Sequence, residues 1–116
     1  MSCDAALQTA LRPLGLPVFP NKYTGMELSY LVTNWSMLGA AHGGDFAQAA
    51  RYLVQVHYYL PDKLNPNPML ERICKALAAA DFTSPDISPA HSDHGQHYAI
   101  ECEYCDGGVD YGDCNP

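Results

Sequence analysis

Between Arg51 and Leu60 every second residue is apolar or aromatic, and this period of two predicts a β-strand. We expect one face of this strand to cover the core, namely Tyr52, Val54, Val56, Tyr58 and Leu60. The opposite face is mixed and includes Leu53, His57 and Tyr59. A mixed face of this kind suits water or a neighbouring subunit. If a neighbouring subunit covers it, we expect Leu53, His57 and Tyr59 to lie on or near that contact.

A second strand is predicted from Leu28 to Met37, where Leu31, Thr33, Trp35 and Met37 alternate with Tyr30, Val32 and Asn34. The segment from Leu38 to Gln48 is rich in glycine and small residues and predicts a long loop. A loop of that length in a compact domain is either functional or mobile. Upstream, the proline-broken stretch GLPVFPNKYTG predicts an extended connection with at most a short edge strand.

Two segments have apolar residues at helical spacing. In the first, Ser2 or Asp4 can cap the helix, and Pro13 predicts that it stops near Arg12. The second covers NPNPMLERICKALAAAD, and Asn67 is its predicted cap. The apolar stripe of this second helix consists of Leu70, Ile73, Cys74 and Leu77.

The stretch from Phe82 to Cys105 predicts a β-hairpin. Its turn is expected around Asp93, His94 and Gly95, and its return strand from Gln96 to Tyr104. One face of the return strand is expected to cover the core, namely Tyr98, Ile100, Cys102 and Tyr104.

Together these elements predict a single α+β domain over residues 1–105. Its expected architecture is a small, mixed, mostly antiparallel sheet with two helices packed on one face. Residues 106–116 are predicted to be a flexible polar C-terminal tail. With both helices on one side, the other face of the sheet is left to water or to a partner.

The charge balance limits the classes of molecule that this protein is expected to bind. The net charge is −7 and the six basic residues are scattered, which argues against nucleic acid as the main partner. The N-terminus lacks the features of a secretory signal, and no apolar run is long enough for a membrane helix. The five cysteines are odd in number, so we expect mostly reduced thiols in a cytosol.

The stretch HSDHGQHYAIECEYC suggests a metal site, with His94, His97, Cys102 and Cys105 as candidate ligands. Strand periodicity, however, directs Cys102 and Cys105 to opposite faces. We therefore expect no metal and no cofactor. A small zinc-binding module is the alternative hypothesis from a different class of function. No cysteine is tied to a histidine base by a motif, and HGGD lacks the context of a phosphate-binding loop, so no enzyme is expected.

Several stretches resemble the small tail-terminator or tail-completion proteins of long-tailed bacteriophages. They are LGLPVFPNKYTG, SYLVTNW, ARYLVQVHYYLP, LERICKALAAADFTSPD and DHGQHYAIECEY, and together they span about residues 3–104. The most specific of them are RYLVQVHYYLP and GQHYAIECEY. The C-terminal CDGGVDYGDC is not part of the family pattern.

The resemblance implies a structural virion protein and not an enzyme. It implies a small mixed sheet flanked by helices, and a homo-oligomeric ring, commonly a hexamer, at the head-proximal end of the tail. The implied partners are other copies of the chain, the tail-tube protein and the neck or head-completion proteins. Assembly would take place in the host cytoplasm. A head-closure protein or another neck connector of the same particle is the alternative.

Overall fold

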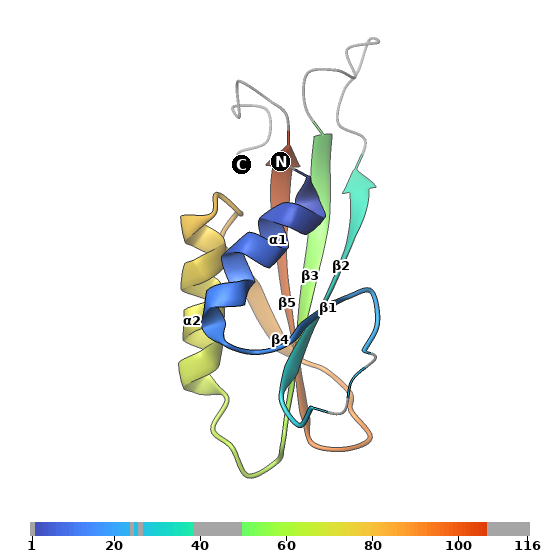
Figure 1. Ribbon diagram of the computed structural model, residues 1–116, viewed down its shortest axis with the longest axis vertical. Coiled ribbons are helices and arrows are strands. Elements are labelled where there is room, and N and C mark those ends of the chain that lie inside the picture. The colour runs from blue at the N-terminus through green and yellow to red at the C-terminus, as the bar shows by residue number, and fades with distance from the viewer. Residues whose placement is uncertain (1, 24, 26, 39–49, 107–116) are drawn as a thin grey trace.

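The computed structural model describes residues 2–23, 25, 27–38 and 50–106, and all five of its strands form one sheet. The strand order is β1–β2–β3–β5–β4 (Figure 1). The short strand β1 (Val18–Pro20) runs parallel to β2 (Tyr30–Leu38). The other neighbours are antiparallel: β3 (Ala50–Leu60), β4 (Asp86–Pro89) and β5 (Gln96–Asp106).

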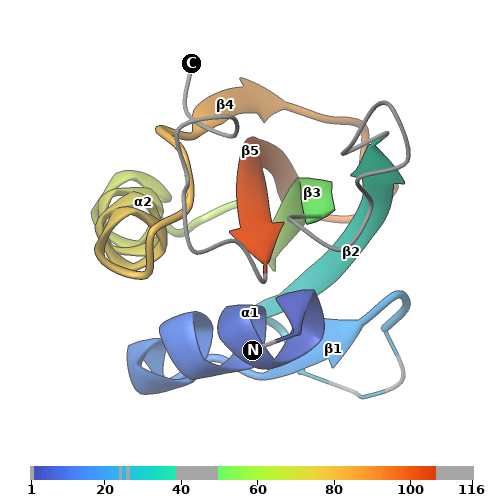
Figure 2. The same ribbon diagram turned by 90° about the horizontal axis from the view of Figure 1, so that it is seen from above.

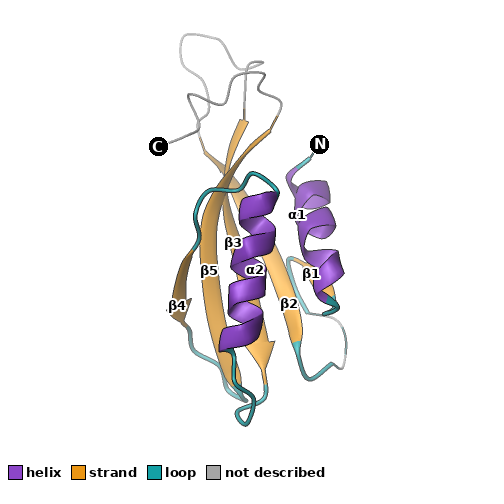
Figure 3. Ribbon diagram, turned by 90° about the vertical axis from the view of Figure 1, so that its left-hand side faces the viewer, coloured by secondary structure: helices purple, strands orange, loops and turns teal. Residues whose placement is uncertain are grey.

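Both helices, α1 (Cys3–Leu11) and α2 (Asn67–Ala79), lie side by side on one face of the sheet (Figure 3). Seen from above, the sheet is bent, with β1 and β4 at its two ends and α2 on the inside of the bend (Figure 2). This arrangement confirms the predicted α+β class and the mixed, mostly antiparallel sheet. Neither of these described helices is long and apolar enough to cross a membrane.

The core lies between the two helices and the covered face of the sheet. Every residue predicted on the core face of β3 is buried, because the period of two places them all toward the helices. The largest side chains that are fully buried are Leu7, Leu11, Leu31, Val54, Val56, Ile73, Leu77 and Ile100. Burial of each such side chain contributes roughly 1.5–3 kcal/mol.

The first helix begins and ends where its sequence predicts. The Ala5 N–H donates to Ser2 Oγ at 3.2 Å, which satisfies one of the free amides at the helix start. After Leu11 the chain tightens into a 3₁₀ turn, Arg12–Leu14, that contains Pro13. A hydrogen bond of 2.8 Å from Trp35 Nε1 to Asp4 Oδ1 links α1 to β2.

The predicted cap of the second helix is wrong. Asn67 is the first residue of α2, and Pro66 occupies the capping position without a side-chain hydrogen bond. The side chain of Asn65 supplies the missing acceptor instead, since its Oδ1 accepts from the Asn67 N–H at 3.1 Å. On the apolar stripe, Leu70, Ile73 and Leu77 are buried, whereas Cys74 is only half-buried.

Both ends of β2 and the C-terminal end of β5 differ from the boundaries that the sequence predicts. Strand β2 starts at Tyr30 and includes Leu38, and the rest of the predicted loop lies outside the described residues. Strand β5 continues past Tyr104 to Asp106, because Asp106 pairs with Ala50 of β3. Asp106, the first residue of the predicted tail, is thus the last residue of β5, and residues 107–116 lie outside the described part of the chain.

Candidate functional site

The face of the sheet opposite the helices is the candidate functional surface, called here the open face. The predicted interface residues Leu53, His57 and Tyr59 all lie on it, and each is partly buried by its neighbours. The register of β2, β3 and β5 brings further residues beside them, namely Tyr30, Val32, Gln55, His97, Ala99 and Glu101.

Four aromatic rings form a stack across the open face, called here the aromatic ladder. Tyr23 follows β1, and Tyr30, Tyr59 and His97 come from β2, β3 and β5. The ring centroids lie 3.9 Å apart for Tyr23 and Tyr30, 4.8 Å for Tyr30 and Tyr59, and 4.1 Å for Tyr59 and His97. The planes of each pair differ by 13°, 16° and 18°. Each contact of this kind contributes about 0.5–1.5 kcal/mol beyond the buried area.

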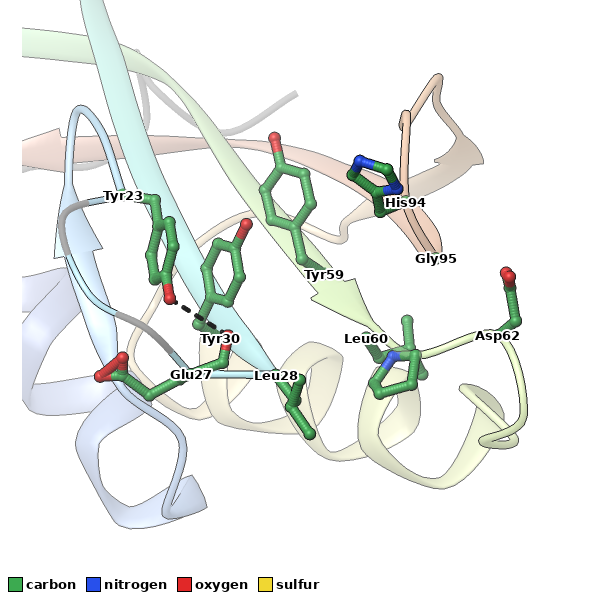
Figure 4. Close-up of a pocket in the computed structure, with 10 residues that line it drawn as sticks. Tyr23, Glu27, Leu28, Tyr30, Tyr59, Leu60, Asp62, His94 and Gly95 are labelled. Carbon is green, nitrogen blue, oxygen red and sulfur yellow. Dashed lines mark hydrogen bonds between the residues drawn. The ribbon is translucent and has the colours of Figure 1, made fainter.

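Three of the four rings of the ladder, Tyr23, Tyr30 and Tyr59, line a pocket of about 410 Å³ (Figure 4). Its walls come from three connecting segments as well as the strands: Tyr23, Glu27, Leu28, Tyr30, Tyr59, Leu60, Pro61, Asp62, His94 and Gly95. The Tyr23 hydroxyl donates to the backbone oxygen of Glu27 at 3.2 Å and so anchors the first ring. Aromatic walls beside an exposed leucine, Leu28, are typical of surfaces that contact proteins.

Beyond the ladder, polar side chains pair across β3 and β5. Arg51 Nη2 lies 2.6 Å from Glu103 Oε1, with about a third of each side chain exposed. Gln55 Nε2 donates to Glu101 Oε2 at 3.2 Å. A partly exposed ion pair contributes at most about 1 kcal/mol, so the Arg51–Glu103 pair adds little to the stability of the fold.

His57 and His97 form a directly bonded pair next to the ladder. His57 Nδ1 lies 2.8 Å from His97 Nε2. On the outer sides of the pair, His57 Nε2 lies 3.3 Å from Gln55 Oε1, and His97 Nδ1 lies 2.7 Å from the carbonyl oxygen of His91. Burial lowers the pKa of His57, the neighbouring His97 lowers it further, and Glu101 opposes both effects.

The four candidate metal ligands are dispersed. His94 is exposed on the hairpin turn, whereas His97 is held in the ladder on the open face. Cys102 faces the helices and is buried, and Cys105 is disulfide-bonded on the opposite face. Within residues 2–23, 25, 27–38 and 50–106, no group of three or more His, Cys, Asp or Glu could hold a metal ion.

The described cysteines differ in whether they form a disulfide. Cys3, Cys74 and Cys102 are not in a disulfide, in line with the expectation of mostly reduced thiols, whereas Cys105 is disulfide-bonded. The disulfide partner of Cys105 lies outside the described residues. Burial, together with the nearby Cys3 and Cys74, raises the pKa of Cys102 to about 12. Its thiol therefore stays protonated at neutral pH, which suits a core residue and not a ligand or nucleophile.

The sequence matches no family model, and no curated protein matches it. The structure is similar to 18 solved protein chains. One of these, known by a sequence label alone, shares 19% identity, with 90% of this chain and 95% of that chain covered and a TM-score of 0.53. At this identity the likeness shows the fold alone.

Proposed function

We propose that this chain is a structural subunit of a bacteriophage tail, and that copies of it form a ring that terminates the tail tube and joins it to the neck. The proposal starts from the resemblance of RYLVQVHYYLP and GQHYAIECEY to tail-terminator proteins. The structural observation that supports it is the open face. RYLVQVHYYLP contributes Tyr59 to this face and GQHYAIECEY contributes His97, and both side chains are half-buried. The role is one of assembly, without catalysis.

The physical state of the open face favours a protein contact. Stacking holds Tyr30, Tyr59 and His97 in place before any partner arrives, so little side-chain entropy is lost on binding. Tyrosine is also enriched in protein interfaces. Leu53 lies on the same face and adds apolar area to the contact.

In the proposed ring, every contact joins two different surfaces. A closed ring is built from heterologous contacts, so the open face of one subunit meets another face of the next. The resemblance points to a hexamer that also contacts the tail-tube protein and a neck protein. The particle is thus the proposed location, at the head-proximal end of the tail.

Changing Tyr59 to Asp tests the contact. The variant places a charged carboxylate within the aromatic ladder. A desolvated carboxylate without a partner opposes association, so we expect the subunit ring to dissociate toward monomers. Sedimentation velocity measures this change. Ile87→Asp is the matched control, since Ile87 is 43% exposed on β4, and it should leave the assembly unchanged. Circular dichroism of both variants checks that the fold is kept. An unchanged assembly of a folded Tyr59→Asp variant would show that the contact lies elsewhere.

Native mass spectrometry with and without the tail-tube protein of the same phage tests the role itself. We expect rings that bind the end of the tube. Binding to a neck protein without binding to the tube would favour the head-closure alternative, and a protein that stays monomeric with both partners would contradict the proposal.

A further inference from the structure

The histidine pair is the centre of a short chain of hydrogen-bonding groups on the open face. Three distances define it: 3.3 Å from Gln55 Oε1 to His57 Nε2, 2.8 Å from His57 Nδ1 to His97 Nε2, and 2.7 Å from His97 Nδ1 to the His91 carbonyl. Both ends of this chain are carbonyl oxygens, which only accept hydrogen bonds.

The number of protons decides how many of these three contacts are hydrogen bonds. Each contact needs one proton on a ring nitrogen, because its outer partners cannot donate. Two neutral imidazoles carry one proton each and so make two of the contacts. The third requires one extra proton, which gives the pair a single positive charge.

Rotation of the Gln55 amide does not remove this requirement. Gln55 Nε2 donates to Glu101 Oε2 at 3.2 Å, which keeps Oε1 directed at His57. The reversed amide would bring its oxygen against the Glu101 carboxylate, and two acceptors would then face each other. Glu101 therefore fixes the end of the chain as an acceptor.

We propose that His57 and His97 act as a proton-sharing switch on the open face, which binds one extra proton in mildly acidic solution and then closes all three contacts. At neutral pH the pair is uncharged and one contact is not a hydrogen bond. The contact between Gln55 and His57 is the longest of the three, so it is the one that changes. The inference concerns the single chain and does not depend on the proposed ring.

The side chains around the histidine pair determine how easily it binds the extra proton. Glu101 is the carboxylate that faces the pair, while Arg51 farther along β3 is held by Glu103. The β2 neighbour of His57 is the apolar Val32. On the hairpin turn, the Asp93 carboxylate is paired with the His91 ring at 3.1 Å.

Two further effects act on the extra proton. The face of Tyr59 stacks on His97, and an aromatic face stabilises an adjacent cation. Burial acts against the proton and lowers the pKa of His57 below its ordinary value of 6.5. The switch is therefore expected to operate in acid and not at neutral pH.

In the unmodified protein, ¹H–¹⁵N NMR spectra of the ring nitrogens of His57 and His97 show directly which nitrogens carry protons. At about pH 7.5 we expect both rings to carry their proton on Nδ1, since His97 Nδ1 donates to His91 and His57 Nδ1 donates to His97. On acidification the signals of both rings should move together with one shared midpoint. Protons on Nε2 of both rings at neutral pH, or two independent midpoints, would overturn the proposal.

A pair of variants separates the switch from ordinary titration. His97→Phe keeps a ring on Tyr59 but removes the acceptor for His57, and we expect the Nδ1 proton signal of His57 to be lost. His94→Gln is the control, because the His94 ring takes no part in the chain of contacts, and it should leave both tautomers unchanged. If His97→Phe keeps the His57 Nδ1 proton, the pair is not coupled. If that variant does not fold, the tautomers of the unmodified protein still decide the question.

Discussion

Tyr59 connects two halves of the open face through a single ring. It stacks on Tyr30 of β2 and on His97 of β5, so its side chain bridges both neighbours of β3. Burial and the nearby Tyr30 raise the pKa of Tyr59 above its ordinary value of 10.0. Its hydroxyl therefore stays neutral at any pH that a cell experiences, and the stack is not disturbed by ionisation at this ring.

His57 makes the stability of the fold depend on pH. Its pKa is lowered in the folded protein, chiefly by burial, so the unfolded chain binds more protons once the pH falls below about 6.5. The free energy of unfolding should thus decrease as the pH falls from neutral through 6.5, until the lower pKa of the folded state is passed.

Urea denaturation at about pH 7.5 and about pH 5.5 measures this dependence. The unmodified protein is expected to lose more stability between the two values than His57→Gln does, because glutamine does not titrate. Equal losses in the two proteins would mean that His57 is not responsible.

At the scale of elements, the hairpin turn depends on Gly95. Its φ of +80° favours glycine, and an added Cβ would lie 2.5 Å from the Leu60 carbonyl oxygen. Gly15 has a similar φ of +85°, but nothing lies within 4 Å of its added Cβ. Gly15→Ala is thus expected to cost about 1 kcal/mol for the left-handed backbone alone, and Gly95→Ala distinctly more. Equal losses in urea denaturation would show that the turn relaxes around the new methyl group.

The sequence predicts those parts of the elements that depend on local spacing. The period of two in β3 identified its core face, and Pro13 identified the end of α1. The same reasoning placed Cys102 and Cys105 on opposite faces, as the structure does. Periodicity is reliable here because it follows from the geometry of one element and needs no knowledge of its neighbours.

Features that depend on pairing between distant segments were not predicted. The aromatic ladder requires the register that aligns Tyr30 with Tyr59 and Tyr59 with His97, and Tyr23 joins it from a connection with no strand pattern. A row of tyrosines at unrelated positions carries no local signal of stacking. The disulfide of Cys105 was missed for a similar reason, since connectivity does not follow from spacing.

At the scale of the whole molecule, β3 is the most protected strand. It is paired along its length on both sides, whereas β1 and β4 lie at the edges with three and four paired residues. We expect the amides of Val54 and Val56 to exchange with deuterium only on global unfolding, and those of β1 and β4 to exchange sooner through local opening. Hydrogen exchange followed by NMR measures this order, and equal protection of β1 and β3 would contradict it.

The position of β3 in the chain has a consequence for synthesis on the ribosome. Its partner β2 precedes it, but β5 ends only at Asp106, after α2 and β4 have been made. At roughly 5–20 residues per second, the stretch from Leu60 to Asp106 takes about 2–9 s to translate. Until β5 has been translated and has left the ribosome, the edge of β3 that pairs with β5 in the folded sheet has no partner strand. Strand β5, which carries Glu101 and Glu103, is the last strand to be made, and its pairing with β3 completes the open face.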